Sequence, residues 1–251
     1  MLKFVNVSAS YNGRTVLDNI NLEFSKNQIT SIIGPNGCGK STLVNCIIHQ
    51  IDHMEGEIMM DELPLTSMSN KERAKRLAVF PQIRQIPTIT AKTLTEHGRF
   101  PHQGFLRRQS ELDKMIVEEA MKFTNTECFS STNVSILSGG ERQRAFFSMC
   151  LAQDSEYIIL DEPTTYMDIS HQFELLSLIK RLRAKGKTII LILHDIPQAL
   201  QISDSIVLME EGRVVSHCPA FRYLENHLIE EVFKIKLKIF KEDGEIYPFV
   251  Y

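Results

Sequence analysis

One eight-residue stretch combines glycines, a lysine and a serine at a spacing that suits an anionic ligand. Residues 34–41 read GPNGCGKS and fit the pattern G-x-x-x-x-G-K-[ST]. Glycines let the backbone approach an anion closely, the lysine adds a positive charge, and the serine hydroxyl is a ligand for Mg²⁺. We expect this phosphate loop to bind a nucleoside triphosphate through Gly34, Pro35, Asn36, Gly37, Cys38, Gly39, Lys40, Ser41 and Thr42.

Two adjacent carboxylates form a second candidate site. Asp161 and Glu162 directly follow YIIL (157–160), which is typical of a buried strand. Ligands of α/β folds bind at the carboxyl ends of strands, although two acidic residues there are also compatible with a solvated strand end. Together with the phosphate loop, the pair favours chemistry, in which Asp161 holds Mg²⁺ and Glu162 polarises an attacking water.

The elements that must position these residues follow from hydrophobic periodicity. Alternating patterns predict strands at 2–11, 19–24 and 56–60, and apolar runs predict buried strands at 28–33, 77–82, 157–160, 188–193 and 205–209. Helices are expected at 41–48, 110–123 and 173–186, the second with Ser110 and Asp113 as a capping pair. Buried strands that alternate with helices predict a parallel sheet covered on both faces.

Composition limits the classes of function. A net charge of −3 over 251 residues offers no electrostatic case for nucleic acid as the main partner. The five cysteines have no metal-ligand spacing, and their odd number suits a reducing compartment. We expect no leader segment and no membrane-spanning helix, so any role at a membrane would act through a partner.

A third motif, LSGGE at residues 137–141, suits the start of a helix. A serine followed by two glycines exposes backbone N–H groups to an anion, and a plain N-cap serine is the local alternative. LSGGE resembles the signature segment of ATP-binding-cassette (ABC) ATPases, and it lies between the phosphate loop and Asp161–Glu162, as in that family. The resemblance extends from about residue 2 to residue 217.

The resemblance implies a fold and a set of roles. The expected fold is α/β, a P-loop NTPase with a RecA-like core, in a single ABC domain over 1–251. An antiparallel β-subdomain, a helical subdomain at about 88–150 and a C-terminal hairpin at about 235–251 belong to it. By family position, Tyr11 stacks on adenine, Gln82 and Ser41 join Asp161 around Mg²⁺, and His194 contacts the γ-phosphate. Ser138, Gly139, Gly140, Glu141 and Asp168 complete the nucleotide site, the signature glycines acting from the opposite subunit.

The same resemblance implies partners. ATP would bridge a homodimer, and the helical subdomain would receive an integral membrane permease dimer at the cytoplasmic face of the cell membrane. An extracytoplasmic substrate-binding protein would act indirectly, and no nucleic acid is expected. EPTTYMDISHQFELL (162–176) and GRFPHQG (98–104) are similar to segments of the importer ATPases for iron chelates, which also serve haem and vitamin B12. The Tyr-Met pair before Asp168 departs from the commoner Ala-Leu.

Rival functions within the family remain to be separated. A chromosome-maintenance or DNA-repair ATPase would need a long coiled coil, and residues 42–136 hold no sustained heptads. A translation factor would carry two cassettes. An efflux ATPase stays open because nucleotide chemistry does not reveal transport direction, whereas Glu162 and His194 disfavour a module that binds ATP without turnover. The seven other histidines, among them His171, are interpreted as structural or surface residues.

Overall fold

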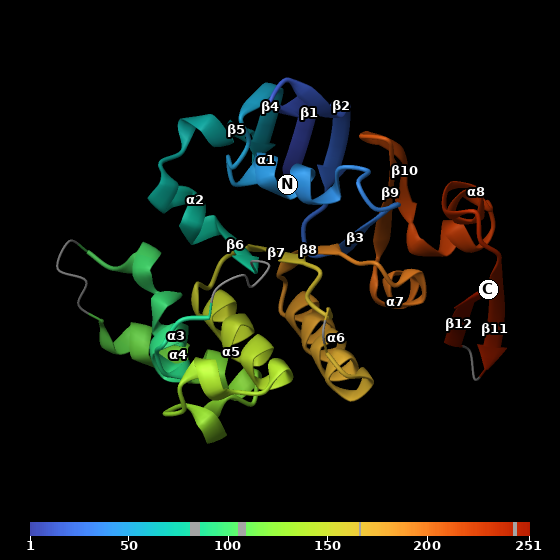
Figure 1. The fold of residues 1–251 in the computed structure, drawn as a ribbon. Coiled ribbons are helices and arrows are strands. Elements are labelled where there is room, and N and C mark those ends of the chain that lie inside the picture. Colours follow the sequence, from blue (N-terminus) through green and yellow to red (C-terminus); the bar gives the residue numbers. More distant parts are fainter. Residues whose placement is uncertain (81–85, 105–108, 166, 243–244) are drawn as a thin grey trace. The chain divides into compact units, whose positions relative to one another are not determined.

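The computed structural model describes residues 1–80, 86–104, 109–165, 167–242 and 245–251. The chain divides into two compact units, of which the first comprises residues 1–67 and 188–251 and the second comprises residues 68–187 (Figure 1). Among the described residues, none of the helices combines the length and the apolar character that a membrane crossing requires.

The first unit contains the predicted antiparallel sheet, whose strand order is β2–β1–β4–β5. Its strands are β1 (Leu2–Tyr11), β2 (Arg14–Phe24), β4 (His53–Met60) and β5 (Leu63–Pro64). Asn12 and Gly13, both with positive φ, form the two-residue turn between β1 and β2. Alternate side chains point into the core, where the rings of Phe4 and Phe24 meet edge to face at 6.2 Å.

A parallel sheet forms the other half of this unit, with β3 between β8 and β9 and β10 antiparallel to β9. Every side chain of β3 and β8 is buried, as the apolar runs predicted. The remaining elements are β3 (Ile29–Ile33), α1 (Lys40–Ile47), β8 (Thr188–Ile192), α7 (Ile196–Ile202), β9 (Ser205–Glu210), β10 (Arg213–Pro219), α8 (Leu228–Phe233), β11 (Leu237–Glu242) and β12 (Glu245–Val250), with 3₁₀ turns at Leu65–Ser67 and Ala220–Leu224. β11 and β12 form the predicted C-terminal hairpin, which packs against α7.

The second unit is mainly helical. Its elements are α2 (Asn70–Arg76), β6 (Leu77–Phe80), α3 (Ala91–His97), α4 (Glu111–Phe123), α5 (Gly139–Ala152), β7 (Tyr157–Asp161) and α6 (Ile169–Ala184), with 3₁₀ turns at Phe100–His102, Glu127–Phe129 and Val134–Ile136. β6 and β7 pair in parallel, with Leu77 opposite Tyr157. Ser110 and Asp113 form a capping box at the start of α4, which confirms the predicted capping pair.

A buried ion pair lies within the helical part of this unit. The Arg99 guanidinium donates to Asp113 at 2.8 Å and to the carbonyl of Ala152 at 2.9 Å, with both side chains of the pair less than a tenth exposed. Burial alone would raise the pKa of Asp113, but hydrogen bonds from Ser110 and Arg99 outweigh it and lower the pKa to about 2. Within GRFPHQG, Gly98 is needed because a Cβ there would lie 2.2 Å from the Met149 carbonyl oxygen.

Replacing Arg99 by Met leaves the Asp113 carboxylate buried without its cation, and should lower the free energy of unfolding by about 3 kcal/mol at pH 7. The folded pKa of Asp113 lies below its ordinary value, so the pair stabilises the chain at neutral pH and loses its contribution as the pH falls from about 5 towards 2. Urea unfolding of parent and variant at several pH values measures this. The difference in free energy of unfolding between parent and variant should become smaller as the pH falls.

Lys114→Met is the control. It breaks the exposed pair with Glu111 and should change the free energy of unfolding little. If the difference between parent and Arg99→Met grew as the pH fell, the ion pair would not be the stabilising interaction.

Candidate active site

The phosphate loop lies between β3 and α1 in the first unit. Gly34 and Gly39, the first and last glycines of the loop, lie so close to neighbouring residues that a Cβ atom would collide with them. A Cβ on Gly34 would lie 2.3 Å from the Met209 carbonyl oxygen, and one on Gly39 would lie 2.7 Å from Leu17. Gly39 also has a φ of 103° and is the N-cap of α1, where a side chain would strain the backbone. The loop is therefore held against β9 and β2 in a shape that only glycine allows at these two positions.

Lys40 occupies the inside of this loop. Its side chain is 6% exposed, and Nζ donates to the carbonyl oxygens of Gly34 at 2.7 Å and Pro35 at 3.0 Å. Burial raises the pKa of the neighbouring Cys38 thiol, against the opposing effect of Lys40, so the thiol stays neutral. Ser41 is exposed at the start of α1, where the positive end of a helix favours anions.

Tyr11 and His194 belong to the same unit as the phosphate loop. The Tyr11 hydroxyl accepts from Asn45 of α1 at 2.9 Å and donates to the Gln50 carbonyl at 3.3 Å, which fixes the ring beside α1. His194 is exposed just after β8, and β8 pairs in parallel with β3. The phosphate loop follows β3 and His194 follows β8. Because the carboxyl ends of parallel strands lie at the same edge of a sheet, both lie at that edge.

In the second unit, Asp161 is the last residue of β7 and Glu162 begins the loop to α6. Glu162 has a φ of 50°, in the left-handed region that a residue with a side chain adopts at an energetic cost. Such strain often marks a functional position. Two glutamines hold the loop's backbone: Gln143 of α5 donates to the Pro163 carbonyl, and Gln172 of α6 donates to the Met167 carbonyl at 3.0 Å.

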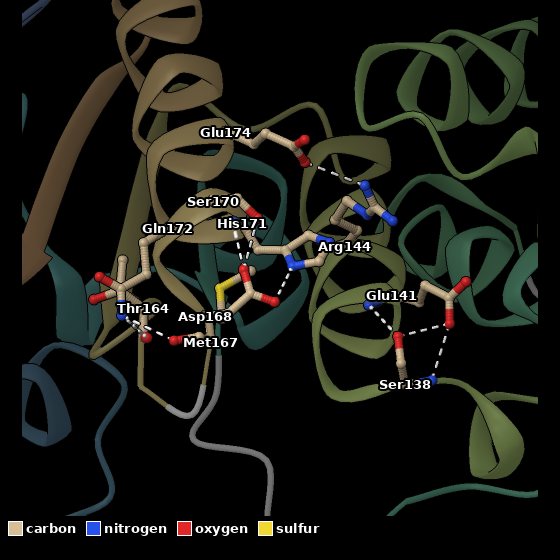
Figure 2. A network of polar contacts seen from close by, with 10 residues as sticks. All are labelled: Ser138, Glu141, Arg144, Thr164, Met167, Asp168, Ser170, His171, Gln172 and Glu174. Carbon is tan, nitrogen blue, oxygen red and sulfur yellow. Dashed lines mark hydrogen bonds and ion pairs between the residues drawn. The ribbon is translucent and has the colours of Figure 1, made fainter.

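The signature segment (residues 137–141) forms the start of α5. Ser138 is the N-cap, and its hydroxyl accepts from the Glu141 N–H at 3.4 Å (Figure 2). Glu141 in turn accepts from the Ser138 N–H at 3.0 Å and from its hydroxyl at 2.7 Å, and these hydrogen bonds lower the pKa of Glu141. The two residues form a capping box, so the N-cap interpretation of Ser138 is correct for this structure.

Asp168 caps the next helix in the same way. Its carboxylate accepts from the backbone N–H of His171 at 3.0 Å and from the Ser170 hydroxyl at 2.8 Å, and it lies 2.7 Å from the His171 ring nitrogen Nδ1 (Figure 2). The structure thus places Asp168 at the start of α6, seven residues after Asp161, the last residue of β7.

Two groups of candidate residues emerge, one in each unit. The first unit gathers the phosphate loop, Tyr11 and His194. The second holds Asp161 at the end of β7, Glu162 directly after it and Asp168 at the start of α6, with the signature segment beside Asp168 at the start of α5. Gln82 lies outside the described residues. Within the described part of the chain, no three His, Cys, Asp or Glu side chains gather to hold a metal.

The roles of Gln143 and Gln172 depend on tertiary contacts, so no local sequence pattern identifies them. His171, which the sequence indicates as a structural or surface residue, is partly exposed and lies against Asp168. The helix predicted at 173–186 begins at Ile169, so Asp168 and His171 lie at its start, and an aspartate three residues before a histidine is a capping pattern that would have identified the pair.

Comparisons with known proteins show the family of this chain. Residues 17–165 match the family model described as ABC transporter. The petrobactin import ATP-binding protein YclP of Bacillus subtilis is 38% identical over 248 residues, which cover 98% of this chain and 97% of that protein. The ferric enterobactin transport ATP-binding protein FepC of Escherichia coli is 35% identical over 240 residues, or 95% and 89% of the two chains.

A solved structure supports the same assignment. The dimeric ATP-binding cassette MJ0796, in a post-hydrolysis state with ADP and phosphate bound, superposes with a TM-score of 0.77 at 27% identity. The match covers 88% of this chain and 99% of that one. The phosphate loop, the signature segment and the acidic pair thus lie in a chain whose fold and sequence both match ATP-binding cassettes. The chain belongs to the ABC transporter family, as one of its ATP-hydrolysing cassettes.

Proposed function

We propose that this chain drives the uptake of iron–siderophore complexes by hydrolysing ATP beneath a separate membrane permease. The observation that carries this proposal is the near full-length similarity, at 35–38% identity, to ATP-binding proteins named for petrobactin and ferric enterobactin transport. The reaction is ATP + H₂O → ADP + phosphate. The protein's part in such a reaction is mainly to position the reactants and to stabilise developing charge.

In this proposal the phosphate loop binds the ATP phosphates. Its backbone N–H groups and the Lys40 ammonium face the phosphate oxygens, and Tyr11 stacks on adenine. The fixed loop of glycines and the anchored hydroxyl of Tyr11 support these roles, because both groups are held in place by the fold.

Glu162 then acts on the water that attacks the γ-phosphate. Its carboxylate takes a proton from that water, while His194 contacts the γ-phosphate and stabilises the charge that develops there. The position of Glu162 directly after the last residue of β7 supports this role, because ligands of parallel sheets bind at the carboxyl ends of the strands. Mg²⁺, held by Ser41, Gln82 and Asp161, would neutralise phosphate charge, and oxygen ligands of this kind suit Mg²⁺ when the nucleotide supplies further ligands.

The proposed assembly is a homodimer with ATP at its interface. Each signature segment, with Ser138, Gly139, Gly140 and Glu141, closes over the nucleotide of the other subunit, and Asp168 lies at the same interface. The single ABC domain over 1–251 carries its permease contact on the helical subdomain at about 88–150. The assembly would lie at the cytoplasmic face of the membrane, and a substrate-binding protein would deliver the iron chelate from outside.

Lys40→Ala and Glu162→Gln should separate binding from turnover. Loss of the ammonium should weaken ATP binding at least tenfold, the size expected for a charged hydrogen bond. Glu162→Gln should leave binding intact and slow hydrolysis by about a hundredfold or more. Titration with a fluorescent ATP analogue and phosphate release measure the two effects. Equal loss of binding in both variants would contradict the assigned roles.

Glu162→Gln should also trap a dimer in the presence of ATP and Mg²⁺, because the γ-phosphate that bridges the subunits is not removed. Size-exclusion chromatography with multi-angle light scattering measures the mass, and ADP in place of ATP is the control. A variant that stays monomeric with ATP would rule out the nucleotide bridge.

Uptake in cells tests the transported substrate. When Glu162→Gln replaces the native chain, uptake of labelled ferric siderophore should stop, while nutrients carried by other ABC importers should enter normally. Normal siderophore uptake would overturn the proposed substrate class, and labelled vitamin B12 and haem, together with export assays, would then identify the cargo.

A further inference from the structure

The first turns of α5 and α6 lie side by side in the second unit, and one imidazole contacts both (Figure 2). A Cβ built on Gly140 would lie 3.2 Å from Cγ of His171 and 3.3 Å from Cδ2 and Nδ1. These distances are shorter than ordinary van der Waals contacts of a methyl group. The ring of His171 thus lies against Gly140, and a side chain at that position would have to displace it by a few tenths of an ångström.

The other contact of the same ring is the carboxylate of Asp168. Because an ionised carboxylate only accepts hydrogen bonds, Nδ1 of His171 carries the proton and donates it to Oδ2 at 2.7 Å. The backbone N–H of His171, its ring and the Ser170 hydroxyl together lower the pKa of Asp168 to about 2, so the carboxylate stays ionised. Asp168 therefore has a fixed direction, set from within its own helix.

A second contact between α5 and α6, an ion pair, lies one turn further along both helices. The Arg144 guanidinium of α5 is 3.3 Å from Glu174 of α6. This pair holds the two helices together but lies away from their N-terminal ends, and Glu174 is more than half exposed. The His171 ring accordingly contacts both functional ends, the signature segment and Asp168.

We propose that His171 is a positioning residue that joins the signature segment at Gly140 to the carboxylate of Asp168, so that both meet the opposite subunit as one rigid surface. This inference rests on the proposed function, in which these two segments close on the partner's nucleotide. A flat ring suits the task because its face packs on a glycine while its edge donates a hydrogen bond in a fixed direction.

The contact itself can be tested in the full chain without nucleotide. In urea unfolding, Gly140→Ala should change the free energy of unfolding less favourably in the parent chain than in a His171→Ala background, because only in the parent must the added methyl group displace the ring. In a His171→Ala background the space is open, so the same substitution should be neutral or stabilising, since alanine favours helices over glycine. Additive effects in this double-mutant cycle would overturn the contact.

The positioning role is tested in the Glu162→Gln background by light scattering with ATP and Mg²⁺. His171→Ala should weaken dimerisation about tenfold or more, as for loss of a charge-assisted hydrogen bond, and His171→Asn, whose amide can donate from a similar position, should restore it to within about threefold. Ser170→Ala is the matched control, because it removes a hydrogen bond to the same carboxylate and leaves the ring on Gly140. ATP binding by the monomer should be unchanged in all three variants.

The outcomes separate a failure of the proposed assembly from a failure of this inference. If Glu162→Gln alone does not dimerise with ATP, both the proposed assembly and this inference are overturned. If Glu162→Gln dimerises, two results would overturn the role of His171 alone. In one, adding His171→Ala leaves dimerisation unchanged; in the other, adding Ser170→Ala weakens it as much as His171→Ala does.

Discussion

The backbone ladder of β3 is the constraint on which the nucleotide-binding half of the molecule depends. All five side chains of this strand are buried, so its N–H and C=O groups find their partners in β8 and β9. That pairing brings the residues after β3 and β8 to one edge of the sheet. It also sets Gly34 against the Met209 carbonyl, where no side chain fits. The phosphate loop is thus a consequence of how the strand before it is paired.

In the second unit, the starts of two helices carry backbone N–H groups without partners inside the helix. The Ser138 hydroxyl accepts a hydrogen bond from such a group of α5, and the Asp168 carboxylate accepts one from α6. Between β7 and α6, glutamines from both helices hold the carbonyl groups of Pro163 and Met167. Ordinary helix capping therefore fixes Ser138, Glu141 and Asp168, which the proposed function assigns to the dimer interface.

Much of this could be predicted from local sequence, and the remainder could not for a physical reason. Apolar runs such as 188–193 located buried strands because continuous burial needs continuous hydrophobicity, and the Ser110–Asp113 pair located a helix start because capping is local. The phosphate loop was recognisable because its chemistry restricts residue type at fixed spacing. The space over Gly140 and the partner of Arg99 depend on which helices pack together, which no local pattern contains. The short helices α2 and α7 lack the repeated apolar turns that identify longer ones.

The position of Lys40 has a consequence for the thermodynamics of ligand binding. A lysine side chain loses up to about 2 kcal/mol of conformational free energy when its rotamers are fixed. Here the fold has already fixed them, because the ammonium is bound to two carbonyl oxygens of its own loop. Phosphate binding therefore exchanges one set of acceptors for another with little further loss of side-chain entropy. Lys40 contributes to affinity through the difference between a carbonyl and a phosphate oxygen as acceptor, and that difference grows with the negative charge of the nucleotide.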